Sequence, residues 1–292
     1  MEIRNSFSRN VFNVCNVTLL TVLSLSMLLP FLHVIAKSFS SSNAIIKGDV
    51  IFWPVDITFN NYQYVFSDVS IWKAFGVSVF ITTVGTLINL IATATFAYPL
   101  SRPEYMGRKY MLMMVLFTMI FSAPLIPTYL VIKSLHLVDT IWVMIIPGLI
   151  SAFNFFVMRS FFADIPGALI DSARIDGCSE GGILVKIVLP LSKPAIATMA
   201  IFYGVSHWNS YQTALYYLND RTLYPLQLKL RQMIVNQELS NAANSSFSDM
   251  IVQSPEGIQM ATVIVATVPI LLIYPLLQRH FTKGMMIGSL KE

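Results

Sequence analysis

Long apolar stretches separated by shorter polar segments make up most of the chain. Few or no charged residues interrupt these stretches, which are residues 11–36, 72–99, 110–132, 140–162, 194–217 and 258–279. A helix that crosses a bilayer needs about 20 predominantly apolar residues, and all six stretches are long enough. The pattern therefore predicts an all-α, polytopic membrane protein with six transmembrane helices, in a single domain over residues 1–292.

The first apolar stretch follows ten mostly polar residues that include Arg4 and Arg9. A secretory signal has a shorter apolar core, of about 7–15 residues, and then a small-residue cleavage site. The stretch 11–36 is much longer than such a core. We therefore expect it to be a retained first helix.

The composition agrees with a lipid environment. Apolar residues make up 55% of the chain and charged residues only 12%, whereas a soluble domain has about 25% charged residues. The two cysteines, Cys15 and Cys178, are far apart in sequence and do not form a disulfide framework or a metal site. The net charge of +4 is explained by its distribution along the chain and requires no nucleic-acid partner.

The distribution of Lys and Arg predicts the orientation in the membrane. With the N-terminus in the cytoplasm, twelve of the nineteen basic residues lie on the cytoplasmic side, as the positive-inside rule requires. Six spans then place the C-terminus in the cytoplasm too. The segment 37–71 becomes an outer cap with interfacial aromatic residues, 163–193 a cytoplasmic loop, and 218–257 a solvated outer loop.

Several kinds of chemistry are missing from the sequence. It has no Gly-x-x-x-x-Gly-Lys phosphate loop, no His-Glu-x-x-His and no Gly-x-Ser-x-Gly motif, so we expect no ATP site, no metal site and no catalytic residue. The predicted spans also have no Asp or Glu at mid-depth. Ion-coupled carriers usually keep such an acid, so a secondary carrier remains only as an alternative, and an intramembrane enzyme is disfavoured.

The cytoplasmic segment 163–193 has the pattern of a helix–turn–helix. Asp164 is a suitable N-cap and Pro166 fits a first turn, so we expect a helix over Ile165–Asp176. Leu169 and Ala173 follow Ile165 at helical spacing and predict one apolar face. Such a helix could press into a groove of a soluble partner or pack on lipid headgroups, and the pattern alone leaves both open.

The turn after this helix is also predicted by local chemistry. Gly177 can take the left-handed conformation that ends a helix, and Ser179 can cap a second helix that ends near Pro190. Gly181 and Gly182 weaken the second helix by about 1 kcal/mol each. A sharp reversal at Gly177 is therefore expected.

The same segment resembles the EAA loop of binding-protein-dependent ABC importers. Asp171-Ser172-Ala173 stands where the family has Glu-Ala-Ala, and both Arg174–Gly177 and Ile187–Pro190 match closely. The resemblance extends over most of the chain and is to the smaller permease subunit of maltose-type sugar importers. It includes Trp53-Pro54, Phe59–Tyr62, Ser101–Pro103, Trp208-Asn209 and Leu223–Gln227, and the tail Gln278–Glu292 looks like the branch that serves larger oligosaccharides, including fragments of acidic polysaccharides such as alginate.

The resemblance implies a place for the chain in a larger importer. A second homologous permease, two ATP-binding cassette subunits that hold ATP and Mg, and an extracytoplasmic sugar-binding protein would be its partners, in a bacterial cytoplasmic (inner) membrane. ATP would drive alternating access. The residues implied in coupling to the ATPase are Leu169, Asp171, Ala173, Arg174, Asp176 and Gly177.

Residues for the other two contacts are predicted from side-chain type. Sugar passage favours aromatic faces and amide or hydroxyl groups, which gives as candidates Asn154, Phe155, Phe156, Tyr203, His207, Trp208, Asn209 and Tyr211. Helix packing is the alternative for each of them, His207 included. The candidates for contact with the binding protein are Asn236, Asn241 and Asn244. An importer of the same kind for a non-sugar solute stays open.

Overall fold

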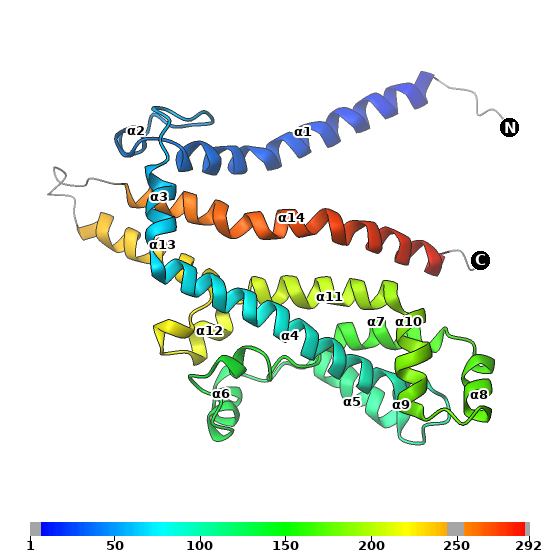
Figure 1. Ribbon diagram of the computed structural model, residues 1–292. Coiled ribbons are helices and arrows are strands. Elements are labelled where there is room, and N and C mark those ends of the chain that lie inside the picture. The colour runs from blue at the N-terminus through cyan, green and yellow to red at the C-terminus, as the bar shows by residue number, and fades with distance from the viewer. Residues whose placement is uncertain (1–6, 244–253, 290–292) are drawn as a thin grey trace. The chain divides into compact units, whose positions relative to one another are not determined.

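The computed structural model describes residues 7–243 and 254–289, and every regular element in these ranges is a helix (Figure 1). In chain order the elements are α1 (Phe7–Ser38), α2 (Ser42–Lys47), α3 (Asn60–Ser67), α4 (Val69–Ser101), α5 (Arg108–Ile120), α6 (Leu125–Ser134), η1 (Ile141–Met144), α7 (Ala152–Ala163), α8 (Gly167–Ile175), α9 (Glu180–Ile183), the π-helical η2 (Leu184–Val188), α10 (Leu189–Leu191), α11 (Lys193–Trp208), α12 (Gln212–Tyr217), η3 (Arg221–Leu223), α13 (Leu226–Ala243) and α14 (Pro255–Ser289). The all-α prediction is confirmed for the described residues.

The chain forms two compact units. One is drawn from Met1–Val69 and Leu230–Thr267, and the other from Ser70–Lys229 and Val268–Glu292. Both candidate sites described below lie in the second unit.

The first unit contains a folded cap, as the composition of segment 37–71 predicted. Asn61 on α3 is buried and donates from Nδ2 to the carbonyl oxygens of Ser38 and Ser40, at 3.1 and 3.2 Å. Lys37 at the end of α1 forms an ion pair with Glu256 at the start of α14. A small apolar core closes the cap: Ala36, Ala44, Ile45 and Val50.

From Val11 onward, helix α1 exposes apolar side chains along its length. Its part from Val11 to Ser38 has a mean hydropathy of 2.2, and only 6% of its most apolar window is buried. So much exposed apolar surface on one helix would be unfavourable in water, whereas all backbone groups of a helix are satisfied in lipid. The helix therefore suits a bilayer.

Three described helices are long and apolar enough to cross a membrane: α1 from Val11, α4, and α14 over Pro255–Leu272. Two bent helix pairs would raise the number to five if each pair is one span. They are α7 with α8, bent by 72°, and the helical run Glu180–Leu191 with α11, bent by 85°. The count of six spans stays a prediction.

Three of the six apolar stretches are not single helices. The stretch 110–132 is divided between α5 and α6 by four residues without helical structure. Pro124 ends that interruption, and proline disfavours helical conformation in the residue before it. The stretch 140–162 is broken around Pro147-Gly148, and 194–217 is broken between Trp208 and Gln212.

The segment 218–257 was expected to be a solvated loop, and this expectation is wrong for its first half. Helix α13 occupies Leu226–Ala243. Leu226, Leu228 and Leu230 are buried at its start, and the amide of Leu226 donates to Ser78 Oγ on α4 at 2.8 Å. The asparagine and serine residues in the later part of the segment favoured a loop. The leucines near the start of α13 are nevertheless buried.

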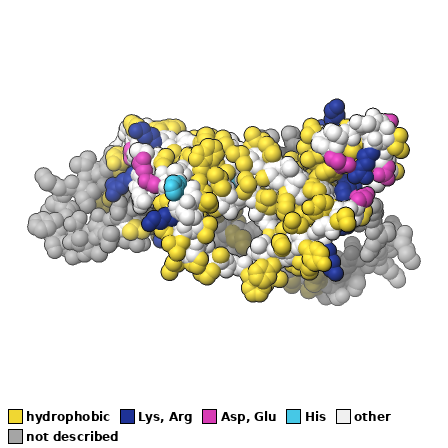
Figure 2. All heavy atoms as spheres, turned by 90° about the horizontal axis from the view of Figure 1, so that it is seen from below, with side chains coloured by type: hydrophobic (Ala, Val, Ile, Leu, Met, Phe, Trp, Pro, Cys, Tyr) yellow, Lys and Arg dark blue, Asp and Glu magenta, His cyan; other side chains and the backbone are white. Residues whose placement is uncertain are grey.

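The second unit has two apolar cores. Helix α7 packs against α5 and α11, and the core around it includes Phe155, Met158, Phe162 and Met199. The other core includes Ile81, Ile145, Ala214 and Leu228. On the face seen in Figure 2, a band of hydrophobic and uncharged side chains separates two groups of charged ones, as expected of a protein that crosses a bilayer.

Two arginines join the end of α4 to α7. Arg102 is buried and donates from Nη2 to the carbonyl of Phe162 at 2.7 Å. In the opposite direction, Arg159 on α7 donates from Nε to the carbonyl of Leu100 at 2.9 Å. Because charge-assisted hydrogen bonds are strong, this pair fixes the place where the chain leaves α7 for the segment that begins at Asp164.

Candidate coupling segment and candidate substrate cavity

Helix α8 forms the first part of the predicted helix–turn–helix but begins later than expected. It runs over Gly167–Ile175 instead of Ile165–Asp176. Asp164 does not cap α8, because α7 continues to Ala163 and Asp164 is the C-cap residue of α7. Pro166 takes the N-cap place with an extended backbone, ψ 127°, and no side-chain hydrogen bond.

The buried face of α8 differs from the predicted one at one position. Ile165 and Ala173 are buried as expected, but Leu169 is 47% exposed and Ile170 is buried in its place. Ile170 packs in the core that also holds Phe162 and Ile183. Leu169 and Ile175, the latter 86% exposed, are therefore apolar side chains that face away from the core of this unit.

The reversal after α8 agrees with the prediction. Gly177 has φ +80°, a region that L-residues with a Cβ rarely adopt. Its amide donates to the carbonyl of Arg174, and the amide of Cys178 donates to that of Ala173, which satisfies carbonyls at the helix end. Ser179 then caps α9 by accepting from the amide of Gly182 at 3.3 Å.

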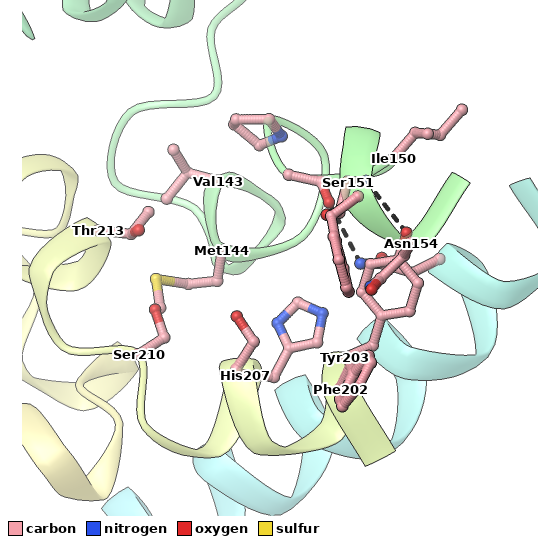
Figure 3. Close-up of a pocket in the computed structure, with 15 residues that line it drawn as sticks. Val143, Met144, Ile150, Ser151, Asn154, Phe202, Tyr203, His207, Ser210 and Thr213 are labelled. Carbon is pink, nitrogen blue, oxygen red and sulfur yellow. Dashed lines mark hydrogen bonds between the residues drawn. The ribbon is translucent and has the colours of Figure 1, made fainter. Parts of the chain in front are cut away.

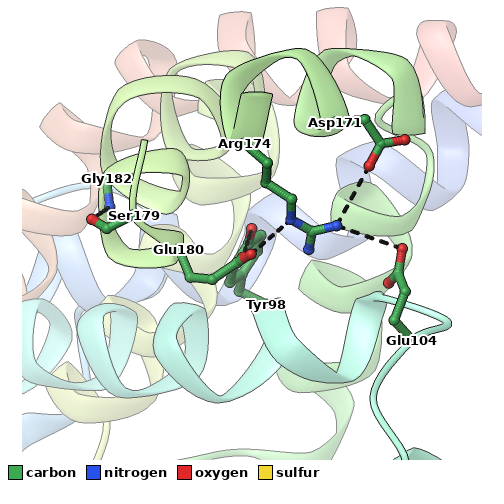
Figure 4. A network of polar contacts seen from close by, with 7 residues as sticks. All are labelled: Tyr98, Glu104, Asp171, Arg174, Ser179, Glu180 and Gly182. Atoms are coloured by element: carbon green, nitrogen blue, oxygen red, sulfur yellow. Dashed lines mark hydrogen bonds and ion pairs between the residues drawn. The ribbon is translucent and has the colours of Figure 1, made fainter. Parts of the chain in front are cut away.

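Arg174 is the centre of a polar network that fastens α8 to its surroundings (Figure 4). Its Nε donates to Glu180 Oε1 at 2.7 Å, and its Nη1 lies 3.4 Å from Asp171 and 3.8 Å from Glu104. Glu180 Oε2 also accepts from the Tyr98 hydroxyl at 2.7 Å. The network thus connects α8 with α9, with the end of α4 and with the segment that follows α4.

These contacts also change the proton affinities of the two main partners. Hydrogen bonds from Arg174, and then from Tyr98, hold the pKa of the Glu180 carboxyl below its usual value. The hydrogen bond to Glu180 raises the pKa of the Arg174 guanidinium. Sequence reasoning predicted Arg174 and Asp171 but missed Glu180, which directly follows the capping Ser179 of α9.

The remaining residues predicted for coupling lie on the same segment. Ala173 is buried against the core and Asp176 is the exposed C-cap of α8, with its amide donating to the carbonyl of Ser172. Leu169, Asp171 and Arg174 lie on α8, and Gly177 lies at the turn that follows it. Their contact with an ATPase stays a prediction.

A cavity of about 520 Å³ lies between α4, α7, α11 and the non-helical residues 145–151 (Figure 3). Its lining is aromatic, amide, hydroxyl and aliphatic, without Asp, Glu, Lys or Arg. The polar and aromatic lining residues are Asn89, Ser151, Phe153, Asn154, Phe202, Tyr203, Ser206, His207, Ser210 and Thr213. Such a lining can bind an uncharged polar group or a sugar ring by hydrogen bonds and stacking.

The structure brings three of the eight predicted path residues together at this cavity: Asn154, Tyr203 and His207. The others lie elsewhere. Phe155 is fully buried beside Phe96, with ring centroids 5.0 Å apart, and Phe156 lies beside α5. Trp208 packs edge-on against Phe75 on α4, at 5.9 Å.

Two further predicted residues, Asn209 and Tyr211, lie in the break between α11 and α12. Asn209 donates from Nδ2 to the carbonyl of Val205 at 3.0 Å, and Tyr211 precedes α12 and is partly exposed. Neither borders the cavity. Among the predicted binding-protein contacts, Asn236 and Asn241 are on the part of α13 whose side chains lie outside the described structure, and Asn244 lies outside the described residues.

Hydrogen bonds hold the cavity wall at residues 148–151. Tyr203 OH shares a hydrogen bond with Thr93 Oγ1 at 2.7 Å and accepts from the amide of Ser151 at 3.0 Å. Asn89 donates from Nδ2 to the carbonyl of Gly148 at 3.2 Å. Sequence reasoning missed Asn89, although an amide in the middle of an apolar stretch is a functional signal in a membrane protein.

The described residues contain no cluster of side chains suited to a metal ion. Within residues 7–243 and 254–289, no three His, Cys, Asp or Glu side chains lie where they could hold one ion.

Comparisons with known proteins give one consistent result. A family model described as "Binding-protein-dependent transport system inner membrane component" matches residues 104–287. The chain is 45% identical over 287 residues to Protein LplC of Bacillus subtilis (strain 168), covering 98% of this chain and 97% of LplC. It is 44% identical over 275 residues to the polygalacturonan/rhamnogalacturonan transport system permease protein YtcP of the same organism. This match covers 93% of this chain and 95% of YtcP.

A solved structure is similar over nearly the whole chain. It is the crystal structure of a bacterial ABC transporter involved in the import of the acidic polysaccharide alginate. The TM-score is 0.88 at 32% sequence identity, and the match covers 96% of this chain and 99% of the solved one.

Proposed function

The chain belongs to the family of binding-protein-dependent transport system inner membrane components, and from this premise we propose that it carries an oligosaccharide into the cell. Family membership makes it the membrane subunit of an ABC importer in the inner membrane, not the ATPase, and confirms the resemblance found in the sequence. It also removes the self-sufficient carrier and the intramembrane enzyme as alternatives. A second permease, ATPase subunits and a binding protein are its partners as a class.

The cavity is the observation that supports a sugar as the cargo. Its walls offer hydroxyl and amide groups from Ser151, Asn154, Ser206 and Ser210, and the rings of Phe153 and Phe202. Sugar hydroxyls both donate and accept hydrogen bonds, and sugar rings pack against aromatic faces. An ionised lining, which would suit a small ion, is not found among its residues.

We take fragments of acidic polysaccharides as the substrate class. Two similar proteins are described by substrates of this kind, polygalacturonan and alginate, and both are polymers of uronic acids. The lining of this chain can meet a carboxylate with neutral N–H and O–H donors. The wall contributed by the second permease would then supply the remaining contacts.

The coupling segment is the proposed contact with one of two ATP-binding cassette subunits, which hold ATP and Mg. Leu169 and Ile175 are large apolar side chains of α8 that are exposed in this chain, and exposed apolar surface marks sites of contact with partners. The Arg174 network joins this helix to α9 and α4. Movement of the docked helix would therefore be passed to α4, which borders the cavity, as a rigid-body change between inward-open and outward-open arrangements.

The remaining contacts of the importer follow the predicted orientation. The N- and C-termini and the coupling segment would face the cytoplasm, with the cap of the first unit on the outer side. Asn236, Asn241 and Asn244 would lie on that outer side and contact the extracytoplasmic sugar-binding protein. The Lys and Arg distribution supports this orientation.

The experiment that tests the cargo is ATPase stimulation in the reconstituted complex with its binding protein. The panel would contain oligosaccharides of polygalacturonan, rhamnogalacturonan and alginate, together with maltotetraose, a tetrapeptide and inorganic phosphate. We expect stimulation by the uronic-acid oligosaccharides above all others. Stimulation by the peptide or phosphate alone would refute carbohydrate import.

The experiment that tests the coupling segment replaces exposed apolar side chains of α8 with serine. Replacing Leu169 and Ile175 with serine should lower the amount of ATPase subunit that co-purifies and abolish sugar stimulation, because the docking surface loses its apolar contacts. Met106 is 99% exposed in the segment after α4, and Met106→Ser is the matched control. If the double variant keeps full sugar stimulation, α8 is an interfacial helix without a coupling role.

A further inference from the structure

His207 borders the cavity, yet one edge of its ring is pressed against α4. A Cβ added to Gly85 on α4 would lie 2.7 Å from His207 Nε2, and 3.0 and 3.1 Å from Cε1 and Cδ2. The residue is 8% exposed, and Nε2 is buried without a hydrogen-bond partner among the described residues. The ring thus rests in a space that exists because position 85 has no side chain.

Asn89 repeats this feature one turn further along α4. Its Nδ2 donates to the carbonyl of Gly148, but its Oδ1 is buried and has no hydrogen-bond partner in the described part of the chain. It lines the same cavity as His207. Two buried polar atoms of residues that line the cavity, His207 Nε2 and Asn89 Oδ1, therefore have no hydrogen-bond partner among the described residues.

The hydroxyl of Tyr203, which lines the same cavity, differs from these two atoms in having hydrogen-bond partners. The Tyr203 hydroxyl is also buried at the cavity, but Thr93 and the amide of Ser151 satisfy it. Tyr203 therefore has a structural explanation in the fold, and the free atoms of His207 and Asn89 do not. An unpaired buried polar group is costly, and in a membrane such groups mark sites of function.

We propose that His207 is a hydroxyl-binding side chain for the oligosaccharide, with Asn89 Oδ1 as a second acceptor beside it. The proposal rests on the function proposed above and deepens it. The imidazole rests against Gly85 in the present arrangement and turns toward the cavity when a sugar enters. One sugar hydroxyl can donate to an unprotonated ring nitrogen or accept from a protonated one, so either tautomer serves.

Gly85 has a separate task in this arrangement, which is to position the ring. With a Cβ at position 85, the ring could not withdraw to its resting place and would stay toward the cavity. The cavity has a volume of about 520 Å³, so a permanently advanced ring would narrow the path for a sugar. Gly85 is thus a positioning residue that allows His207 to withdraw after the sugar has passed.

The first test measures sugar binding with labelled galacturonan tetrasaccharide as the probe. The complex of two permeases and two ATPase subunits is used without the binding protein, so that only sugar bound in the membrane is counted. His207→Leu should raise Kd about three- to tenfold, the effect of one net hydrogen bond. His207→Gln, which keeps a donor and an acceptor, should stay within about twofold of wild type.

The matched control is Thr86→Val. Thr86 follows Gly85 on α4, and its Oγ1 is also buried without a hydrogen-bond partner in the described ranges, but it borders an apolar groove beside Trp208 instead of the cavity. Its replacement should leave Kd unchanged. If His207→Leu binds the probe as wild type does, the proposal is overturned, while a wild type that fails to bind the probe and responds to no sugar of the panel overturns the proposed function itself.

The second test is a double-variant comparison of transport at saturating sugar. Gly85→Ala should lower maximal transport, and adding His207→Ala should restore it, because the displaced ring is then gone. A Gly85→Ala variant with wild-type transport would overturn the positioning role. So would a defect that persists in the double variant, since the added methyl group would then act on something other than His207.

Discussion

Replacing Arg174 with methionine should loosen the coupling segment without unfolding α8. Methionine resembles the aliphatic stem of arginine and has a similar helix propensity, so the helix itself is not affected. The variant loses the contacts of the guanidinium with Glu180, Asp171 and Glu104. Three carboxylates then remain near each other without the cation between them.

The size of the effect follows from geometry and exposure. The hydrogen bond to Glu180 at 2.7 Å is charge-assisted, but the two side chains are 35% and 56% exposed, so solvent reduces its contribution to about 0.5–1 kcal/mol. The longer contacts at 3.4 and 3.8 Å add a few tenths of a kcal/mol each. The sum is about 1 kcal/mol, which corresponds to about 2–4 °C in Tm.

The assay is thermal unfolding of the purified complex at low and high salt, with sugar-stimulated ATPase activity measured in parallel. Lys186→Met is the matched control, since Lys186 is exposed on η2 of the same segment and makes no ion pair in the described part of the chain. The difference between the two variants should be largest at low salt. At about 1 M salt, where the Debye length is about 3 Å, most of it should disappear.

Two results would refute this reasoning. If Arg174→Met and Lys186→Met have equal Tm values at low salt, the network contributes nothing beyond net charge. If their difference persists at high salt, its cause is packing of the arginine stem and not the ion pairs.

Stimulation of the ATPase should fall with Arg174→Met because α8 is less firmly joined to α4.

Three further predictions concern single positions. Gly177→Ala should destabilise the turn by about 1–2 kcal/mol through its left-handed backbone alone, since an added Cβ would meet no atom within 4 Å; Gly177→Asn should cost less, and equal Tm values for the two variants would contradict this. The pKa of Glu180 is lowered in the fold, so its contribution is fully present above the usual carboxyl pKa and is lost as the pH falls through the lower folded value; the Tm difference between wild type and Glu180→Gln should therefore vanish in acid, and a difference that grows there would sink the idea. Tyr203→Phe leaves Thr93 and the Ser151 amide without a partner and should cost about 1–3 kcal/mol in thermal unfolding, whereas Tyr110→Phe, at a position 67% exposed, should cost little.

The sequence by itself determined the class of protein and the local chemistry of the coupling segment. Apolar stretches of membrane-spanning length indicate lipid whatever their partners are. Gly177 and Ser179 act through their own backbone and side chain, so their roles at the turn could be predicted without knowing what packs nearby. The family could be found for the same reason, because its motif lies in one short segment.

The tertiary structure alone decided which faces are buried and which residues meet. The helical spacing of Leu169 from Ile165 predicted that Leu169 lies on the buried face of α8. Ile170 is buried instead, because the core around Phe162 and Ile183 meets the helix there. The cavity brings together α4, α7, α11 and the residues between η1 and α7. Gly85 and His207 are 122 positions apart in sequence, and their contact exists because two helices cross closely, which no local pattern encodes.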